Sequence, residues 1–138
     1  MTPVGPRHRF RGSAGGAFPY DARRTPPAPV VPIRLAAPQA EPTVALVALV
    51  DSGADLTVLP EGLPDAIGLP QIGVVTVRGV GGVVRRVPVY AAQIEVAGTR
   101  RIVEAAVVGD AALLGRDVLN RWVVTLDGPR LVMRVRAP

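Results

Sequence analysis

The sequence of 138 residues contains neither cysteine nor lysine, and its only histidine is His8. The lack of cysteine excludes disulfides, thiolate metal sites and cysteine nucleophiles. The lack of lysine excludes the lysine of a phosphate-binding P-loop and any Schiff-base mechanism. A single histidine near the N-terminus argues against a Ser-His-Asp triad and against a histidine-based zinc site. If the protein carries out acid–base chemistry, its carboxylates must perform it.

Long hydrophobic runs are also absent. No apolar stretch approaches the roughly 20 residues of a membrane-spanning helix, and the N-terminus lacks the apolar core of a signal peptide. We therefore expect a cytoplasmic protein that does not use a membrane. Aromatic residues make up only 4% of the chain while hydrophobic residues reach 49%, so aliphatic side chains must fill the core. The 15 Gly and 15 Pro residues favour short strands and turns over helices.

The positive charge of the chain is concentrated near its N-terminus. Residues 1–40 carry six Arg and one Asp, a net charge of +5, whereas residues 41–138 carry ten Arg and ten acidic residues, a net charge of 0. Sequence rich in Arg, Pro and Gly cannot bury enough apolar surface to order itself. We therefore predict a flexible arm over residues 1–28 and one domain over residues 29–138. Within the arm, Phe18-Pro19-Tyr20 has the apolar surface to dock on the domain.

Hydrophobic alternation predicts an all-β, barrel-like domain of about eight short strands and one helix. Leu114, Val118 and Trp122 recur every four residues, which predicts a short helix that begins near Arg116. Residues 61–70 hold Leu63, Ala66 and Ile67 at near-helical spacing between prolines and are expected to form one short helical turn at most. The expected strands cover residues 30–36, 43–50, 55–60, the two sides of Gly79–Gly82, residues 100–108 and the two sides of Asp127-Gly128.

An acid follows directly after the most hydrophobic run, in the order Leu49-Val50-Asp51-Ser52-Gly53. Burying an unpaired carboxylate is costly, so Asp51 is either satisfied by a local turn or poised for chemistry. Gly53 permits a tight backbone, and nearby N–H groups and the Ser52 hydroxyl can hydrogen-bond a carboxylate. Because Asp-Ser-Gly is also an ordinary turn tripeptide, it does not indicate a function by itself.

Three segments occur in the same order and at similar spacing as in retropepsin-like aspartic proteases, the retroviral type. They are ALVDSGADLTVLP (48–60), the glycine hairpin RGVGGVV (78–84) and ALLGRDVLNRW (112–122). The chain resembles this family over about residues 28–138. The resemblance implies a closed, single-lobed acid-protease barrel with a flap hairpin and one short C-terminal helix.

The resemblance implies catalytic positions at Asp51, Ser52 and Gly53, of which Asp51 matches the catalytic aspartate. Asp55 and Arg116 match an ion pair that buttresses the catalytic loop at the dimer interface. The implied substrate-binding positions lie on this loop and at the flap tip: Ala54, Asp55, Val80, Gly81 and Gly82. The implied supporting positions lie behind the loop: Leu113, Leu114, Gly115, Arg116 and Asp117. No metal or other cofactor is implied.

Peptide hydrolysis by carboxylates alone requires two of them that share a water and a proton. The chain has one Asp-Ser/Thr-Gly, since Asp127-Gly128-Pro129 lacks the hydroxyl residue. The second Asp51 must then come from an identical subunit, with both copies on a two-fold axis. The expected protein is therefore a homodimeric aspartic endopeptidase that binds an extended peptide.

Two other functions remain open. One is a catalytically silent dimer of the same fold that serves as an assembly module, although the intact Asp-Ser-Gly and flap count against it. The other is a nucleic-acid-binding protein that acts through its Arg-rich arm, although the domain is neutral and lacks interleaved aromatics. The pairs Arg85-Arg86 and Arg100-Arg101 do not form basic surfaces, because neighbouring strand residues face opposite sides.

Overall fold

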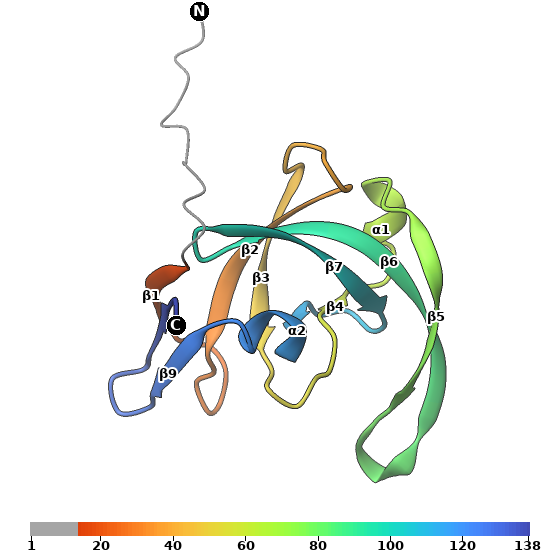
Figure 1. Ribbon diagram of the computed structural model, residues 1–138. Coiled ribbons are helices and arrows are strands. Elements are labelled where there is room, and N and C mark those ends of the chain that lie inside the picture. The colour runs from red at the N-terminus through yellow and green to blue at the C-terminus, as the bar shows by residue number, and fades with distance from the viewer. Residues whose placement is uncertain (1–13) are drawn as a thin grey trace, which may run out of the picture.

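The computed structural model describes residues 14–138, which form two β-sheets and two one-turn helices (Figure 1). His8 and the rest of the predicted arm up to residue 13 lie outside the described residues. Within residues 14–138, no helix has the length and apolar character needed to cross a membrane.

The larger sheet contains seven strands, and six of them close into a barrel because β2 pairs with β6 as well as with β3. The seventh strand, β5, pairs with β6 alone and forms a long hairpin with it that extends beyond the barrel (Figure 1). In spatial order the strands are β2 (Val30–Ala36), β3 (Val44–Val50), β8 (Leu113–Leu114), β4 (Val58–Leu59), β7 (Thr99–Val107), β6 (Val84–Val96) and β5 (Gln71–Arg78). This architecture confirms the closed all-β barrel and the glycine-tipped hairpin that we predicted.

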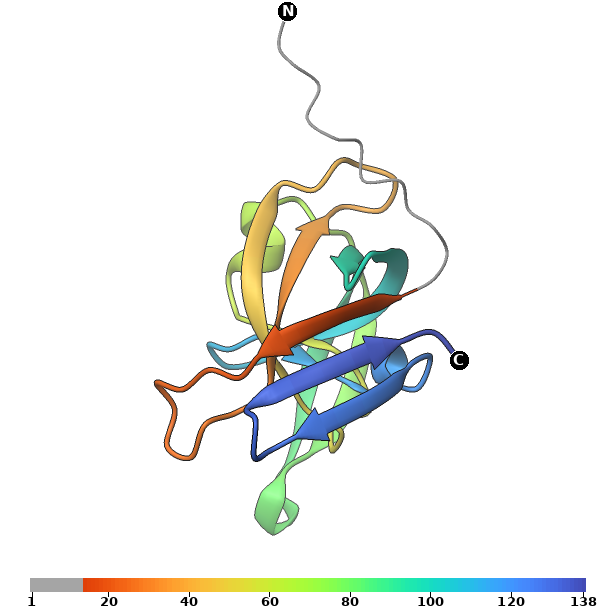
Figure 2. The same ribbon diagram turned by 90° about the vertical axis from the view of Figure 1, so that its left-hand side faces the viewer.

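A second sheet of three antiparallel strands lies beside the barrel (Figure 2). Its middle strand is β10 (Val132–Arg136), which pairs on one side with β9 (Val123–Asp127) and on the other with β1 (Gly15–Pro19). The β9–β10 hairpin confirms the turn predicted at Asp127-Gly128.

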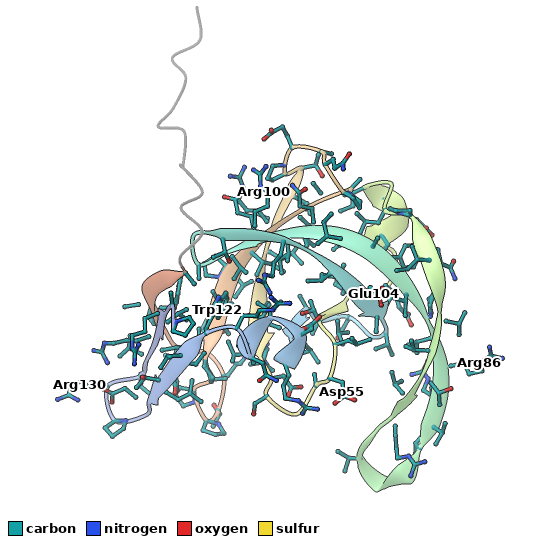
Figure 3. All side chains as sticks on the ribbon, viewed as in Figure 1. Asp55, Arg86, Arg100, Glu104, Trp122 and Arg130 are labelled. Carbon is teal, nitrogen blue, oxygen red and sulfur yellow. The ribbon has the colours of Figure 1, made fainter. Side chains whose placement is uncertain are left out.

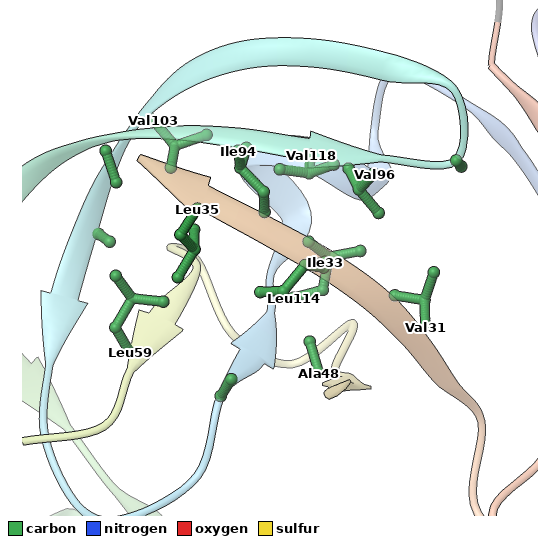
Figure 4. Packing of buried hydrophobic residues seen from close by; sticks show 14 of the residues in the cluster. Val31, Ile33, Leu35, Ala48, Leu59, Ile94, Val96, Val103, Leu114 and Val118 are labelled. Atoms are coloured by element: carbon green, nitrogen blue, oxygen red, sulfur yellow. The ribbon is translucent and has the colours of Figure 1, made fainter. Parts of the chain in front are cut away.

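The core is aliphatic, as the shortage of aromatic residues required. Strand β2 alternates between buried and exposed side chains and buries Val31, Ile33 and Leu35. Leu59 and Ile94 pack into the same cluster from β4 and β6 (Figure 4). This burial of branched aliphatic side chains supplies the main stabilisation of the barrel, at about 25 cal/mol for each Å² of apolar surface removed from water.

Residues 14–28 differ from the flexible arm that the sequence predicted. Strand β1 pairs with β10 along its length, so that Phe18 lies opposite Met133. Phe18 and Tyr20 pack against the core cluster. The following loop is closed by backbone hydrogen bonds between Asp21 and Ala28. The strand was not predicted because its pairing partner lies more than 100 residues away, and its own Gly- and Pro-rich sequence has no strand pattern.

The helices follow the prediction. Helix α2 (Arg116–Leu119) begins at the expected residue, and Trp122 beyond it packs partly buried against the core. The one-turn helix α1 (Leu63–Ala66) lies in the segment where we expected one short helical turn at most. Pro64 lies in the first turn of α1, where a missing N–H costs nothing.

The structure of the core predicts that substitutions of two aliphatic residues on adjacent strands, one buried and one exposed, change the free energy of unfolding by very different amounts. Ile33 is 1% exposed and Val47 is 57% exposed. Ile33→Ala should lower the free energy of unfolding by about 2–5 kcal/mol, because it removes buried methylene groups and leaves a cavity. Val47→Ala should change it by less than about 0.5 kcal/mol. Urea denaturation followed by tryptophan fluorescence measures both; equal losses would contradict the assigned inward face of β2.

Candidate active site

Asp51 stands at the point where β3 leaves the barrel. The end of β3 pairs in parallel with β8, which places Val50 beside Leu114. The Asp51 N–H continues this pairing and donates a hydrogen bond to the Leu114 carbonyl at 3.0 Å. The segment from Asp51 to Thr57, here called the Asp51 loop, therefore starts from a fixed position on the sheet.

The carboxylate of Asp51 is held by the turn that it begins. The Gly53 N–H donates to Oδ1 of Asp51 at 2.9 Å, and the Ala54 N–H donates to the Asp51 carbonyl at 3.2 Å. Asp51 is half-buried, while Ser52 and Gly53 are exposed. The turn thus orients a carboxylate that solvent, or a ligand, can still reach.

Arg116, the first residue of α2, fastens the middle of the Asp51 loop. Its guanidinium donates to the Ser52 carbonyl at 2.8 Å and forms an ion pair with the Asp55 carboxylate. Its backbone N–H donates to the Ala54 carbonyl at 2.9 Å. Asp55 is 84% exposed and lies on the outer side of the loop (Figure 3). The Arg116–Asp55 pair predicted from the sequence is therefore present within one subunit.

Thr57 closes the Asp51 loop, and the sequence did not single it out. Its side chain is fully buried, and both of its donors are directed at Asp117: the N–H at 3.0 Å and the hydroxyl at 2.9 Å. The hydroxyl also accepts a hydrogen bond from the Gly115 N–H at 3.3 Å. The available signal was a threonine inside a short apolar strand, because a buried hydroxyl needs a partner.

Position 115 requires glycine because there is no room for a Cβ atom, and not because its backbone angles are unusual. Its φ of −93° and ψ of −177° are open to any residue. A Cβ at this position, however, would lie 2.6 Å from the carbonyl carbon and oxygen of Leu56 and 2.9 Å from the Thr57 nitrogen. The backbone of the Asp51 loop therefore rests directly on Gly115.

A further cation lies behind the loop. Burial lowers the pKa of the Arg101 guanidinium, the neighbouring charge of Arg121 lowers it further, and the carboxylate of Asp117 acts in the opposite direction. Asp117 therefore has both hydrogen-bond donors and a positive charge within electrostatic range. Among residues 14–138, no three His, Cys, Asp or Glu side chains gather to form a metal site.

The predicted flap tip belongs to a separate part of the structure. Val80, Gly81 and Gly82 form a short 3₁₀ turn between β5 and β6, closed by a hydrogen bond from the Gly79 N–H to the Val83 carbonyl at 2.8 Å. Gly81 and Gly82 have φ of +83° and +78°, which favours glycine. Val80 is fully exposed. Figure 1 places this tip and the Asp51 loop on the same side of the barrel.

The structure thus brings most of the predicted positions together at one place. Strands β3 and β8 and helix α2 join the Asp51 loop to the residues expected to support it, and only the flap-tip residues stand apart on their own hairpin. Chemically, the site offers two accessible carboxylates on a loop that is fixed at its start, its middle and its end: Asp51, which is oriented by the turn, and Asp55, which is paired with Arg116.

Comparisons with known proteins agree with this geometry. The family model described as gag-polyprotein putative aspartyl protease matches residues 43–121, which include the Asp51 loop, the hairpin and α2. No curated protein sequence matches the chain. Among solved structures, the chain is similar to EIAV protease complexed with the inhibitor HBY-793, with a TM-score of 0.54 and 23% sequence identity. That match covers 67% of this chain and 86% of the EIAV chain, and it shows a shared fold.

The close contact between Gly115 and the Leu56 backbone predicts that one added methyl group lowers the stability of the protein markedly. Gly115→Ala should lower the free energy of unfolding by about 1–3 kcal/mol, because the new Cβ overlaps the backbone of the Asp51 loop. Gly73→Ala is the matched control, since a Cβ on Gly73 meets nothing within 4 Å. Thermal unfolding of both variants measures the difference; equal melting temperatures would show that the loop does not rest on Gly115.

The buried Thr57 hydroxyl predicts a second contrast. Thr57→Val keeps the shape of the side chain but leaves Oδ1 of Asp117 without that donor, and should cost about 1–3 kcal/mol of stability. Thr57→Ser keeps the hydroxyl and should recover most of the loss. Chemical denaturation compares the two variants, and an equally destabilised Thr57→Ser would mean that packing of the methyl group matters and the hydrogen bond does not.

Proposed function

The chain belongs to the gag-polyprotein putative aspartyl protease family, and from this we propose that two copies of it form an aspartic endopeptidase. Each subunit contributes one Asp51, and the two carboxylates share the water that attacks the peptide bond. The observation that carries the proposal is the accessible carboxylate of Asp51, which has no cationic partner among the described residues and is oriented by the Gly53 N–H on a loop that is fixed at its start, middle and end.

The chemistry requires the two Asp51 side chains to differ in protonation. Two carboxyl groups about 3 Å apart cannot both ionise, so one proton is shared between them and their titration belongs to the pair. The ionised carboxylate accepts a proton from the water as its oxygen bonds to the peptide carbonyl carbon. The protonated carboxyl donates to the carbonyl oxygen. When the C–N bond breaks, the carboxyl that took the water proton donates it to the leaving nitrogen, a hydroxyl of the tetrahedral intermediate returns its proton to the other carboxylate, and the pair regains its starting state.

The distribution of exposed apolar side chains supports a second subunit. Five of the large exposed hydrophobic residues lie on the β5–β6 hairpin: Ile72, Val74, Val80, Val83 and Val84. Apolar surface gathered in this way favours a covering partner. In the proposed dimer, the tip residues Val80 and Val83 meet the partner's hairpin and the bound peptide, whereas Val74 and Val84 lie on the opposite face of the hairpin from Val75 and Val77. The hairpin closes over the peptide to exclude water.

The proposed substrate is an extended peptide held by backbone hydrogen bonds in the manner of an added strand. The hairpin and the strands next to the Asp51 loop present mainly Val and Leu side chains, which favours apolar residues beside the scissile bond. Asp55 and the flap-tip residues Val80, Gly81 and Gly82 are the proposed contacts with the peptide backbone.

Replacement of Asp51 tests the proposal directly. Wild-type protein should cleave members of a mixed peptide library between pH 4 and 7, and Asp51→Asn should lose at least about a thousandfold in rate, because it removes the group that transfers the proton. Glu41→Gln, which changes an exposed acid on the β2–β3 connection, should keep full activity. Mass spectrometry of the products measures the rates and reports the side-chain preference.

The same variant tests for a shared site. In an equal mixture of exchanged wild-type and Asp51→Asn subunits, only about one quarter of the dimers hold two intact carboxylates, so activity should fall below the half expected for independent subunits. Absence of cleavage by a demonstrated dimer would favour the assembly module. Equal cleavage by wild type and Asp51→Asn would show that Asp51 is not the catalytic group.

A further inference from the structure

The β5–β6 hairpin carries three arginines that do not share one face. Residues paired across an antiparallel ladder point to the same side of the sheet, and successive residues of one strand point to opposite sides. Arg85 is paired with Val77, whereas Arg86 is paired with Thr76 and Arg78 with Val84. Arg85 therefore lies on one face of the hairpin, and Arg78 and Arg86 lie on the other.

The face of Arg85 can be followed through the strand pairings to the Asp51 loop. On β6 it continues through Val87 and Val89, each 3% exposed. It then crosses to the neighbouring strands through a chain of direct pairs: Val89 with Ala106, Ala106 with Val58, and Val58 with Leu113. Leu113 precedes Leu114, whose carbonyl holds the Asp51 N–H.

This face is not the barrel interior. The next residue along each of these short strands, namely Leu59 on β4 and Leu114 on β8, belongs to the core cluster, whereas Val58 and Leu113 do not. The Arg85 face is therefore the second side of the same strands, the side on which the Asp51 loop lies; it is buried at Val87, Val89 and Ala106 and half-buried at Val58 and Leu113. In agreement, Figure 3 shows Arg86 directed away from the barrel and from the Asp51 loop.

Arg85 is exposed, and within residues 14–138 its side chain has no hydrogen bond or ion pair. The nearest residues on its face of the hairpin are apolar: Val75, Val77 and Val87. The acid on the facing loop, Asp55, is already paired with Arg116. The Arg85 guanidinium thus stands unpaired among the valines of the hairpin, and the acid on the same face, the exposed Glu104, lies further along it, beyond Ala106 on β7.

We propose that Arg85 selects the substrate by binding the carboxylate of an Asp or Glu side chain in the peptide between the hairpin and the Asp51 loop. This inference rests on the proposed function and refines its substrate class to an apolar peptide with an acidic residue near the cut. A guanidinium binds a carboxylate through two parallel hydrogen bonds, which a neutral amide cannot match. Closure of the hairpin over the peptide removes water and strengthens the pair.

Matched peptides test the proposal. Starting from a peptide that the wild-type protein cleaves, Glu or Gln is placed in turn at each of the four positions on either side of the scissile bond. At one or two positions the wild type should favour Glu over Gln by about tenfold in kcat/KM, as expected for a charge-assisted hydrogen bond. The preference should shrink as the salt concentration rises.

The three arginines provide their own controls. Arg85→Gln should abolish the preference for Glu, and Arg85→Glu should replace it with a preference for Arg at the same position. Arg86→Gln and Arg78→Gln remove the same charge from the opposite face and should leave the preference unchanged. The inference is overturned if wild type cleaves Glu and Gln peptides equally at every position, or if the Arg86→Gln and Arg85→Gln variants lose the preference to the same extent.

Failure of the proposed function has a different signature. If the wild type cleaves no peptide, the endopeptidase proposal is contradicted, and the affinities of the same Glu and Gln peptides are measured by fluorescence anisotropy. Tighter binding of Glu peptides that Arg85→Gln abolishes would then support Arg85 as a recognition residue without catalysis, and equal affinities would overturn it.

Discussion

The arrangement of the site depends on the buried bond between Thr57 and Asp117. A polar group that loses water must find a partner inside the protein, and Thr57 directs both its N–H and its hydroxyl to one carboxylate. That carboxylate stands at the start of α2 and also accepts the Val118 N–H. The link therefore fixes the end of the Asp51 loop to a segment 60 residues further along the chain. With this end held, Arg116 can reach the middle of the loop, and the turn at Asp51 keeps its orientation.

The same short strands contribute side chains both to the core and to the face that lies beside the Asp51 loop. Strands β4 and β8 have only two residues each, and each gives one side chain to the core and one to the opposite face, beside the Asp51 loop. Successive residues of a strand point to opposite sides, so no further layer of structure is needed between the barrel interior and the Asp51 loop. The fully buried Leu59 and Leu114 are therefore direct chain neighbours of Val58 and Leu113, which lie beside the Asp51 loop. A displacement of the core would move these two residues with it.

The sequence allowed prediction of features that arise from local pattern. Asp51 was identified because an acid after an apolar run needs a physical reason, and the hairpin tip because Gly81 and Gly82 permit positive φ. The start of α2 at Arg116 followed from helical spacing. Features that arise from distant pairing were not predicted, as with β1 and with Thr57, whose partners lie far along the chain. In the sequence, Leu131 continues the alternation of Met133 and Val135, but it lies in the turn before β10 with φ of +53° and is 39% exposed, while the other two are buried.

The pairing of β1 with β10 places the two ends of the described chain side by side. Gly15 lies opposite Arg136, and the Ala137 N–H donates to the Ala14 carbonyl at 3.1 Å. Because the strands are antiparallel, a pulling force applied to both ends would load these hydrogen bonds one at a time, as in opening a zipper. The three-stranded sheet would peel apart at low force, while the barrel and its Asp51 loop stayed intact. In this pulling geometry, the first hydrogen bonds to break therefore belong to the outer sheet, away from the Asp51 loop.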